Sequence, residues 1–144
     1  MFSKACEYGI RASIYIAEQT LLSRKVSLKE VAAAIESPVA YTSKILQLLV
    51  RNNTINSDKG PKGGFYMDQE ELPKLKLSDI VSTIDGNTIY VGCGLGLSRC
   101  NENKPCSLHS QFKVIRDELR HMLEKTTIKS LAEDLDKGLA FLKH

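Results

Sequence analysis

The sequence predicts a mostly α-helical protein, in which a winged helix-turn-helix head precedes a long dimerisation helix and a C-terminal helix. Three observations support this prediction. Apolar residues recur at helical spacing in both halves of the chain. Ser27 and Glu30 form a capping box, which marks the start of a short second helix. A turn rich in glycine, 58–64, separates two short segments of strand-like composition.

The first half of the chain contains three predicted helices. Apolar residues at 10, 14, 17 and 21 predict a helix from Lys4 to about Thr20, and the capping box begins a second helix that reaches Ile35. Ser37 is the expected cap of a third helix, with Pro38 in its first turn and its end near Asn53. Two short helices joined by a tight turn are typical of a helix-turn-helix.

A hairpin follows the third helix. Its predicted strands are 54–57 and 65–67, and the turn between them combines lysine with glycine. Glycine lets a backbone approach a phosphate closely, and lysine neutralises phosphate charge. We therefore interpret the hairpin as the wing of a DNA-binding head.

The second half begins with a predicted helix, 77–84. From Leu108, apolar residues at 108, 112, 115, 119 and 122 form a seam that suits a helix packing against another helix. Thr127 is the expected cap of a last helix, which reaches Leu142. We assign 1–76 to a winged helix-turn-helix DNA-binding domain, and 77–144 to a cluster-binding loop (93–109) and the dimerisation helices.

Charge and composition agree with this division. The 144 residues carry a net charge of +3, and residues 1–67 contain nine Lys/Arg against five Asp/Glu. A basic first half suits a head that binds nucleic acid. No secretory signal or membrane span is visible, so we expect a cytoplasmic protein with no membrane partner.

Three cysteines and a histidine form the main candidate site. Six residues separate Cys93 from Cys100, five separate Cys100 from Cys106, and two separate Cys106 from His109. In a reducing cytosol this pattern indicates metal or redox chemistry. The alternatives are an iron–sulfur cluster, zinc, thiol-based sensing of oxidants and a Cys–His enzyme. The remaining cysteine, Cys6, lies in an apolar helical pattern and is predicted to be a buried core residue.

Several of these residues together resemble the IscR–NsrR–CymR family of bacterial winged-helix regulators. The resemblance rests on Ser3-Lys4 with Tyr8, on 41–49, on 59–65, and on the three cysteines with His109. It implies a homodimeric transcription regulator that binds a double-stranded DNA operator, takes no small-molecule substrate and is not an enzyme. The residues that we predict to bind DNA are Ser3, Lys4, Lys29, Tyr41, Ser43, Lys44, Gln47, Lys59, Gly60, Lys62 and Gly63.

The resemblance also implies an iron–sulfur cluster at Cys93, Cys100 and Cys106, with 2Fe-2S favoured over 4Fe-4S and zinc as the alternative metal. His109 is the favoured fourth ligand, and Glu7 of the partner chain is the alternative. Two departures stand out. Lys59 occupies a wing position that is usually arginine, and the gap before Cys100 is one residue longer than the usual five, which leaves the cluster type open. We expect a repressor whose DNA affinity the cluster controls; the alternative is a cluster-free regulator that uses zinc or thiol oxidation.

Overall fold

The computed structural model describes residues 1–144, and it is mostly helical with one antiparallel β-hairpin. The predicted fold class is confirmed. No helix is both long and apolar enough to cross a membrane. Along the chain the elements are α1 (Lys4–Leu21), α2 (Leu28–Ala34), α3 (Val39–Arg51), β1 (Asn56–Asp58), β2 (Gly64–Tyr66), a 3-10 turn η1 (Leu72–Lys74), α4 (Leu77–Asp85), α5 (Thr88–Val91), α6 (His109–Lys125) and α7 (Ile128–Asp136).

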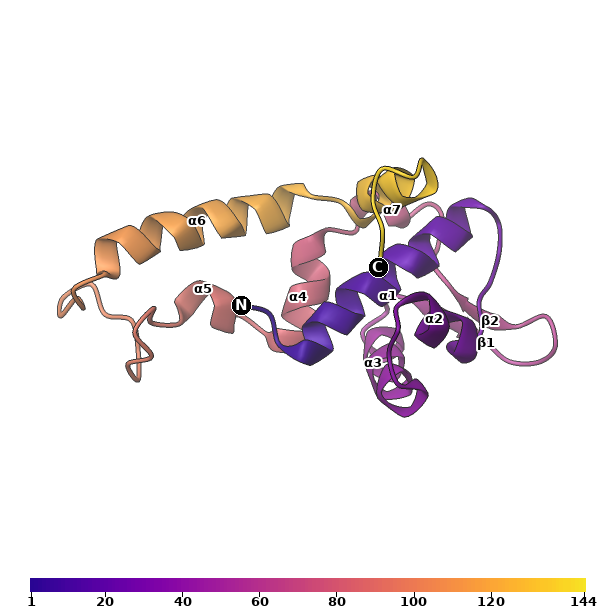
Figure 1. Ribbon diagram of the computed structural model, residues 1–144, viewed down its shortest axis with the longest axis horizontal. Helices are drawn as coiled ribbons and strands as arrows, with labels where there is room; N and C mark the ends of the chain where they lie inside the picture. The colour runs from indigo at the N-terminus through magenta and orange to yellow at the C-terminus, as the bar shows by residue number, and fades with distance from the viewer.

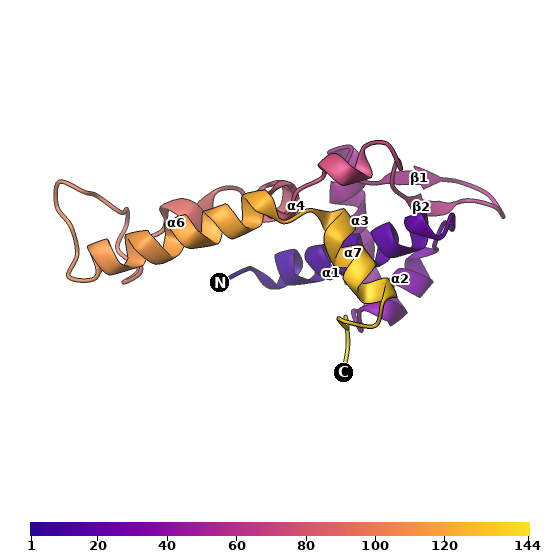
Figure 2. The same cartoon turned by 90° about the horizontal axis from the view of Figure 1, so that it is seen from above.

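The molecule divides visibly into a compact part and a projecting part. We call α1–α3 with the hairpin the head, and α5, the loop 92–108 and α6 the arm (Figure 1). Helix α1 runs through the middle of the compact part, where it packs against α3, α4 and α7. Its fully buried Ile16 shares one core with Leu46 of α3, Ile80 of α4 and Leu123 of α6. The C-terminal helix therefore returns onto the head, as Figure 2 also shows.

The start of α1 is fixed by the end of α4. Ser3 caps α1, because its hydroxyl oxygen accepts a hydrogen bond from the Cys6 amide at 3.0 Å. The Asp85 carboxylate in turn accepts the Ser3 amide at 2.9 Å and the Ser3 hydroxyl. Asp85 is the last residue of α4 and lies just before α5, so one carboxylate joins the base of the arm to the first turn of the head.

The helix-turn-helix forms with one half of the predicted capping box. The Ser27 hydroxyl accepts from the Glu30 amide at 3.2 Å, whereas the Glu30 carboxylate lies 3.9 Å from Arg24 instead of reaching back. The predicted Ser37 cap is wrong, because α3 begins at Val39 with Pro38 as its cap residue. The Ser37 hydroxyl lies 2.8 Å from the Thr42 hydroxyl and caps no backbone amide of α3.

The wing is anchored at its base by a third backbone segment. Strands β1 and β2 pair with Ser57 opposite Phe65; β1 lies slightly later in the chain than predicted, and β2 one residue earlier. Val26 exchanges two backbone hydrogen bonds with Phe65, at 3.0 and 2.7 Å. Gly64 adopts φ 137° beside Val26, and a Cβ there would lie 2.7 Å from the Val26 carbonyl oxygen, so this close approach requires glycine.

The helices after α4 differ from the sequence prediction in three ways. The short helix α5 was not predicted, and α7 ends at Asp136 and not at Leu142, because Gly138 with φ 71° terminates it. The apolar seam of α6 is also divided. Phe112 and Leu119 are half-buried against their own chain, whereas Ile115 is 57% exposed and Met122 is 44% exposed.

Candidate DNA-binding face and cysteine loop

Helix α3 presents a polar face to solvent. Tyr41, Lys44 and Gln47 are exposed, and the opposite face of the helix is buried in the head. The Gln47 side-chain amide donates to the Ser43 hydroxyl at 3.2 Å, which aligns two polar groups one helical turn apart. This arrangement offers donors and acceptors suited to base edges in a major groove.

Aromatic and cationic side chains of α1 form a contact cluster with Tyr41, in the first turn of α3. Tyr41 meets Tyr8 of α1 edge to face, with ring centroids 5.5 Å apart. Lys4 and Arg11 lie over the Tyr8 ring, at 5.4 and 4.7 Å from its centroid. Arg11 also donates to the Ile35 carbonyl at 3.0 Å, so it ties α1 to the turn before α3. Arg11 is not among the residues predicted from the sequence, although it lies three residues after Tyr8 on one face of α1.

The wing carries two unpaired lysines at its tip. Lys59 and Lys62 are exposed and form no ion pair, and Gly60 adopts φ 95° in the turn between them. At the base of the wing, Lys25 pairs with Asp58 at 2.6 Å. The hydrogen bond from Lys25 lowers the pKa of Asp58, which keeps this pair charged.

The helix face and the wing border one groove. Its lining includes Gln47 and Arg51 of α3 together with Ser57 and Phe65 of the hairpin, and its volume is about 350 Å³. Of the residues predicted to bind DNA, Gln47 is the one that lines this groove, and the wing-tip residues 59–63 lie outside its lining. Lys29 is exposed on α2. Ser3 lies at the far end of α1, where its hydroxyl is already engaged with Cys6 and Asp85.

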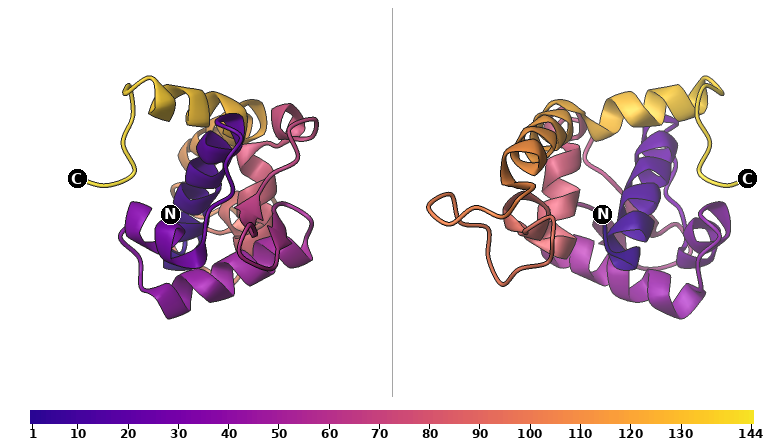
Figure 3. Two further views of the ribbon diagram at one scale, coloured as in Figure 1. Left: turned by 90° about the vertical axis from the view of Figure 1, so that its right-hand side faces the viewer. Right: turned by 60° about the vertical axis from the view of Figure 1, so that its left-hand side comes forward.

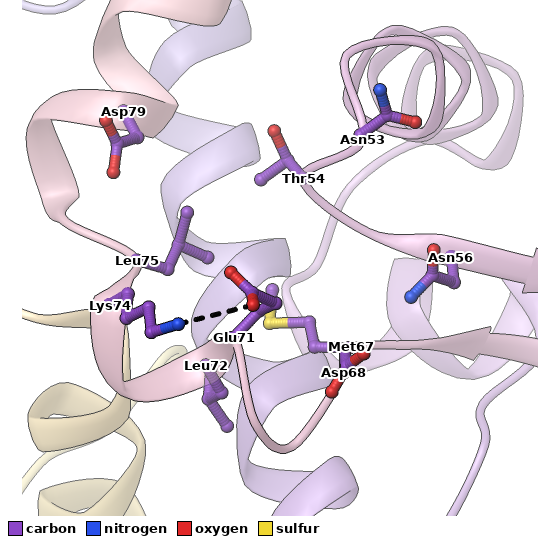
Figure 4. A pocket seen from close by; sticks show the side chains of 10 residues that line it. All are labelled: Asn53, Thr54, Asn56, Met67, Asp68, Glu71, Leu72, Lys74, Leu75 and Asp79. Carbon is purple, nitrogen blue, oxygen red and sulfur yellow. Dashed lines mark hydrogen bonds and ion pairs between the residues drawn. The ribbon is translucent and has the colours of Figure 1, made fainter.

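A separate cavity of about 320 Å³ lies between the end of α3, the hairpin, η1 and α4 (Figure 4). Three carboxylates, of Asp68, Glu71 and Asp79, are among its lining groups, and Glu71 pairs with Lys74 at 3.4 Å. None of the predicted DNA or metal residues lines it. Because carboxylates repel phosphate, this side of the molecule does not suit a nucleic acid backbone.

The cysteine loop lies at the outer end of the arm, between α5 and α6 (Figures 1 and 3). Its four predicted ligands form two pairs. The Sγ atoms of Cys93 and Cys106 are 3.9 Å apart, and Cys100 Sγ lies 3.2 Å from Nδ1 of His109. All three thiols are free and half-buried. No three such side chains are gathered around a position for a single metal ion.

Backbone and side-chain donors surround these sulfur atoms. The Leu95 amide lies 3.4 Å from Cys93 Sγ, and hydrogen bonds from the amides of Leu95 and Leu97 lower the pKa of Cys93. Arg116 of α6 donates to Cys100 Sγ at 3.3 Å and to the Gly92 carbonyl at 2.7 Å. Arg116 is not among the residues predicted from the sequence, although it follows His109 by seven residues on the same face of α6.

Comparison with known proteins identifies the family. The sequence profile of Rrf2, described as an iron-dependent transcriptional regulator, matches residues 2–134. The chain belongs to the Rrf2 family. It is similar to an HTH-type transcriptional regulator of Aquifex aeolicus, with 28% identity over 141 residues that cover 96% of each chain. It is also similar to IscR of Escherichia coli, with 20% identity over 109 residues that cover 76% of this chain and 66% of that regulator.

Solved structures share the Rrf2 fold of this chain. CymR of B. subtilis, described as its global cysteine regulator, superposes with a TM-score of 0.76 at 22% identity, over 92% of this chain and 96% of CymR. IscR of T. potens gives a TM-score of 0.74 at 18% identity, over 97% of this chain and 91% of that chain. The predicted resemblance and winged helix-turn-helix fold are confirmed. As an Rrf2 protein, the chain is a DNA-binding transcription regulator and not an enzyme.

Proposed function

We propose that this Rrf2 regulator is a homodimeric repressor whose DNA affinity is controlled by an iron–sulfur cluster held at Cys93, Cys100 and Cys106. The observation that carries the proposal is the grouping of donors into two pairs, Cys93 with Cys106 and Cys100 with His109. A 2Fe-2S cluster needs two protein ligands on each iron, and histidine replaces cysteine in some such centres. Zinc instead needs four ligands around one position, and that arrangement is not assembled here.

The residues present therefore fit a two-iron cluster in donor type and in pairing. When bound, the cluster supplies a redox-active and oxidant-sensitive group. The chain's own contribution is to orient and neutralise the ligands. Arg116 and the backbone amides near Cys93 donate to sulfur, and such hydrogen bonds offset the charge of a thiolate ligand. His109 is the proposed fourth ligand, because it contacts Cys100 within the same chain.

DNA binding is assigned to the polar face of α3 and to the wing. Tyr41, Ser43, Lys44 and Gln47 would read base edges or phosphates in the major groove, and Lys59 and Lys62 would follow the adjacent backbone. Glycines 60 and 63 allow the wing tip to approach closely. Lys4 and Lys29 are assigned weaker roles in DNA binding, and Ser3 is left out of the proposed face because its hydroxyl is engaged with Cys6 and Asp85. Residues 1–76 then form the DNA-binding domain, and 77–144 carry the cluster loop and the dimer contact.

The proposed dimer uses the exposed side of α6. Val114, Ile115 and Met122 are 58%, 57% and 44% exposed. A second copy that packed its own α6 there would bury these side chains. Such a dimer would place two α3 helices in successive major grooves about 34 Å apart.

An anaerobic preparation tests the cluster. The purified chain should be coloured and should contain iron and sulfide in equal amounts, and Cys93→Ser or Cys106→Ser should lose both. Cys6→Ala is the matched control, because Cys6 is fully buried in the head core, away from the loop. A colourless protein with stoichiometric zinc would contradict the proposal.

A further inference from the structure

Two of the free thiols are close enough to react with each other. Cys93 Sγ and Cys106 Sγ are 3.9 Å apart, and neither takes part in a disulfide. A disulfide requires about 2.05 Å, so the two sulfur atoms need to approach by about 2 Å. Both residues lie in the same chain, 13 positions apart, so the bond would be intramolecular.

The loop backbone permits this approach. No helix or strand occurs between Gly92 and Leu108, and Gly96, three residues after Cys93, adopts φ 73°. Glycine directly precedes and follows Cys93, which widens the range of backbone conformations open to this residue. Cys106 lies just before α6 and is held at its carbonyl by the His109 amide at 3.0 Å. Movement of the Cys93 side therefore suffices to close the bond.

The other two thiols are directed elsewhere. Cys100 Sγ is engaged by His109 at 3.2 Å and by Arg116 at 3.3 Å. Cys6 is fully buried, and burial, with Asp85 nearby, raises the pKa of its thiol to about 12. Only Cys93 and Cys106 face each other without an intervening group.

We propose that, when the chain holds no cluster, a peroxide oxidises Cys93 and Cys106 to an intramolecular disulfide. This inference rests on the proposed function only in using the same cysteines. The sulfur of Cys93 attacks the peroxide, the O–O bond breaks, and a sulfenic acid forms while the departing oxygen is protonated to water. The sulfur of Cys106 then attacks Cys93 Sγ, the S–S bond forms, the S–O bond breaks, and the departing hydroxide takes the Cys106 proton as a second water.

The disulfide would lock the loop in a state that cannot hold the cluster. It consumes two of the three proposed cysteine ligands, so iron and sulfide cannot be loaded until a thiol reductant opens the bond. The regulator would thus have two successive responses to oxidants, first loss of the cluster and then formation of the disulfide.

Disulfide mapping tests the inference on the full chain, freed of metal anaerobically and treated with an equimolar amount of hydrogen peroxide. Free thiols are blocked with N-ethylmaleimide before digestion. Trypsin leaves Cys100 and Cys106 on one peptide, because Lys104 precedes Pro105, and cleavage after Glu102 by Glu-C separates them. We expect a peptide pair that joins Cys93 to Cys106, with Cys100 alkylated. A bond through Cys100, a bond between two chains, or four free thiols would overturn the inference.

Serine variants provide the matched controls. Cys100→Ser should keep the crosslink, whereas Cys93→Ser and Cys106→Ser should lose it and remain monomeric on non-reducing gels. Loss of the crosslink in Cys100→Ser would show that Cys100 is required, and would overturn the pairing. Cys6 is an internal standard, since it should be alkylated only after unfolding.

Reconstitution separates this inference from the proposed function. The oxidised chain should take up no iron and sulfide until dithiothreitol is added, whereas the reduced chain should take up both. If the reduced chain also fails to take them up, the cluster proposal fails, and the mapped disulfide still stands. If the reduced chain loads normally and peroxide produces no Cys93–Cys106 bond, the disulfide inference fails alone.

Discussion

At the scale of single residues, the type of metal site proposed here depends on which donors of the cysteine loop are paired, more than on how many donors there are. Spacing in the sequence indicates that Cys93, Cys100, Cys106 and His109 belong to one loop, but it cannot indicate which donor meets which. The structure pairs Cys100 with His109 and Cys93 with Cys106. It also adds Arg116, whose Nε is buried without a hydrogen-bond partner while its two Nη atoms contact the loop.

The fourth ligand can be identified with three substitutions. We predict that His109→Ala lowers the iron content and shifts the visible absorption bands, because it removes one donor of a pair. His109→Cys should keep the cluster and lower its midpoint potential, since a thiolate adds negative charge. Glu7→Ala should change neither property, because Glu7 lies on α1 and pairs with Lys4 of its own chain at 3.1 Å. Loss of iron in Glu7→Ala with a normal His109→Ala would contradict this assignment.

At the scale of elements, the wing is assigned to DNA binding, and α6 is assigned to support of the cysteine loop and to the dimer contact. The wing carries its lysines on a hairpin that Val26 holds at the base, so substitution at the tip should not disturb the fold. Helix α6 instead supports the loop with one face and exposes apolar side chains on another.

The wing prediction concerns charge. Lys59→Ala with Lys62→Ala should weaken binding to all DNA sequences and reduce the slope of log affinity against log salt by about 2, because two phosphate contacts are lost. The matched control is Lys74→Ala with Lys129→Ala, which removes the same charge from an exposed and a half-buried position outside the proposed face. Equal effects of the two double variants on DNA affinity would count against the wing.

The α6 prediction concerns assembly. Ile115→Glu should convert the dimer to a monomer in analytical ultracentrifugation, because a charged group would replace an apolar contact. Its helical content should not change, since Ile115 is 57% exposed in the chain. Lys113→Ala is the control, because residues two positions apart point to opposite sides of a helix. A wild-type chain that sediments as a monomer would contradict the proposed dimer.

Local patterns predicted most elements, and the misses have physical causes. Caps and periodicity are local, so Ser27 and Thr127 correctly marked the starts of α2 and α7. The start of α3 was predicted wrongly because a contact between Ser37 and Thr42 replaced the expected cap. Phe112 and Leu119 belong to the predicted apolar seam of α6, and packing against distant parts of their own chain leaves both half-buried, which helical periodicity alone does not indicate. Arg11 and Arg116 were missed because their partners are distant in sequence.

At the scale of the whole molecule, the arm and the head are joined at a small number of contacts. The cysteine loop connects α5 to α6, and α5 follows α4 in the chain. The last residue of α4, Asp85, accepts a hydrogen bond from the Ser3 amide at the start of α1. Through α1, Tyr8 contacts Tyr41 on the proposed DNA-binding face. Leu123 of α6 and the packing of α7 on α1 form a second connection. Packed elements thus run without a break from the loop to the head, and they are the route by which the proposed control would act.

The DNA affinities of the cluster-loaded and cluster-free chains test the central claim most directly. Both states are titrated anaerobically, at one salt concentration, against one DNA fragment selected by the protein from a random pool. We predict that the two affinities differ by about five- to 150-fold, which corresponds to a coupling free energy of about 1–3 kcal/mol. Equal affinities in the two states would contradict control by a cluster, even if the loaded chain contains iron and sulfide.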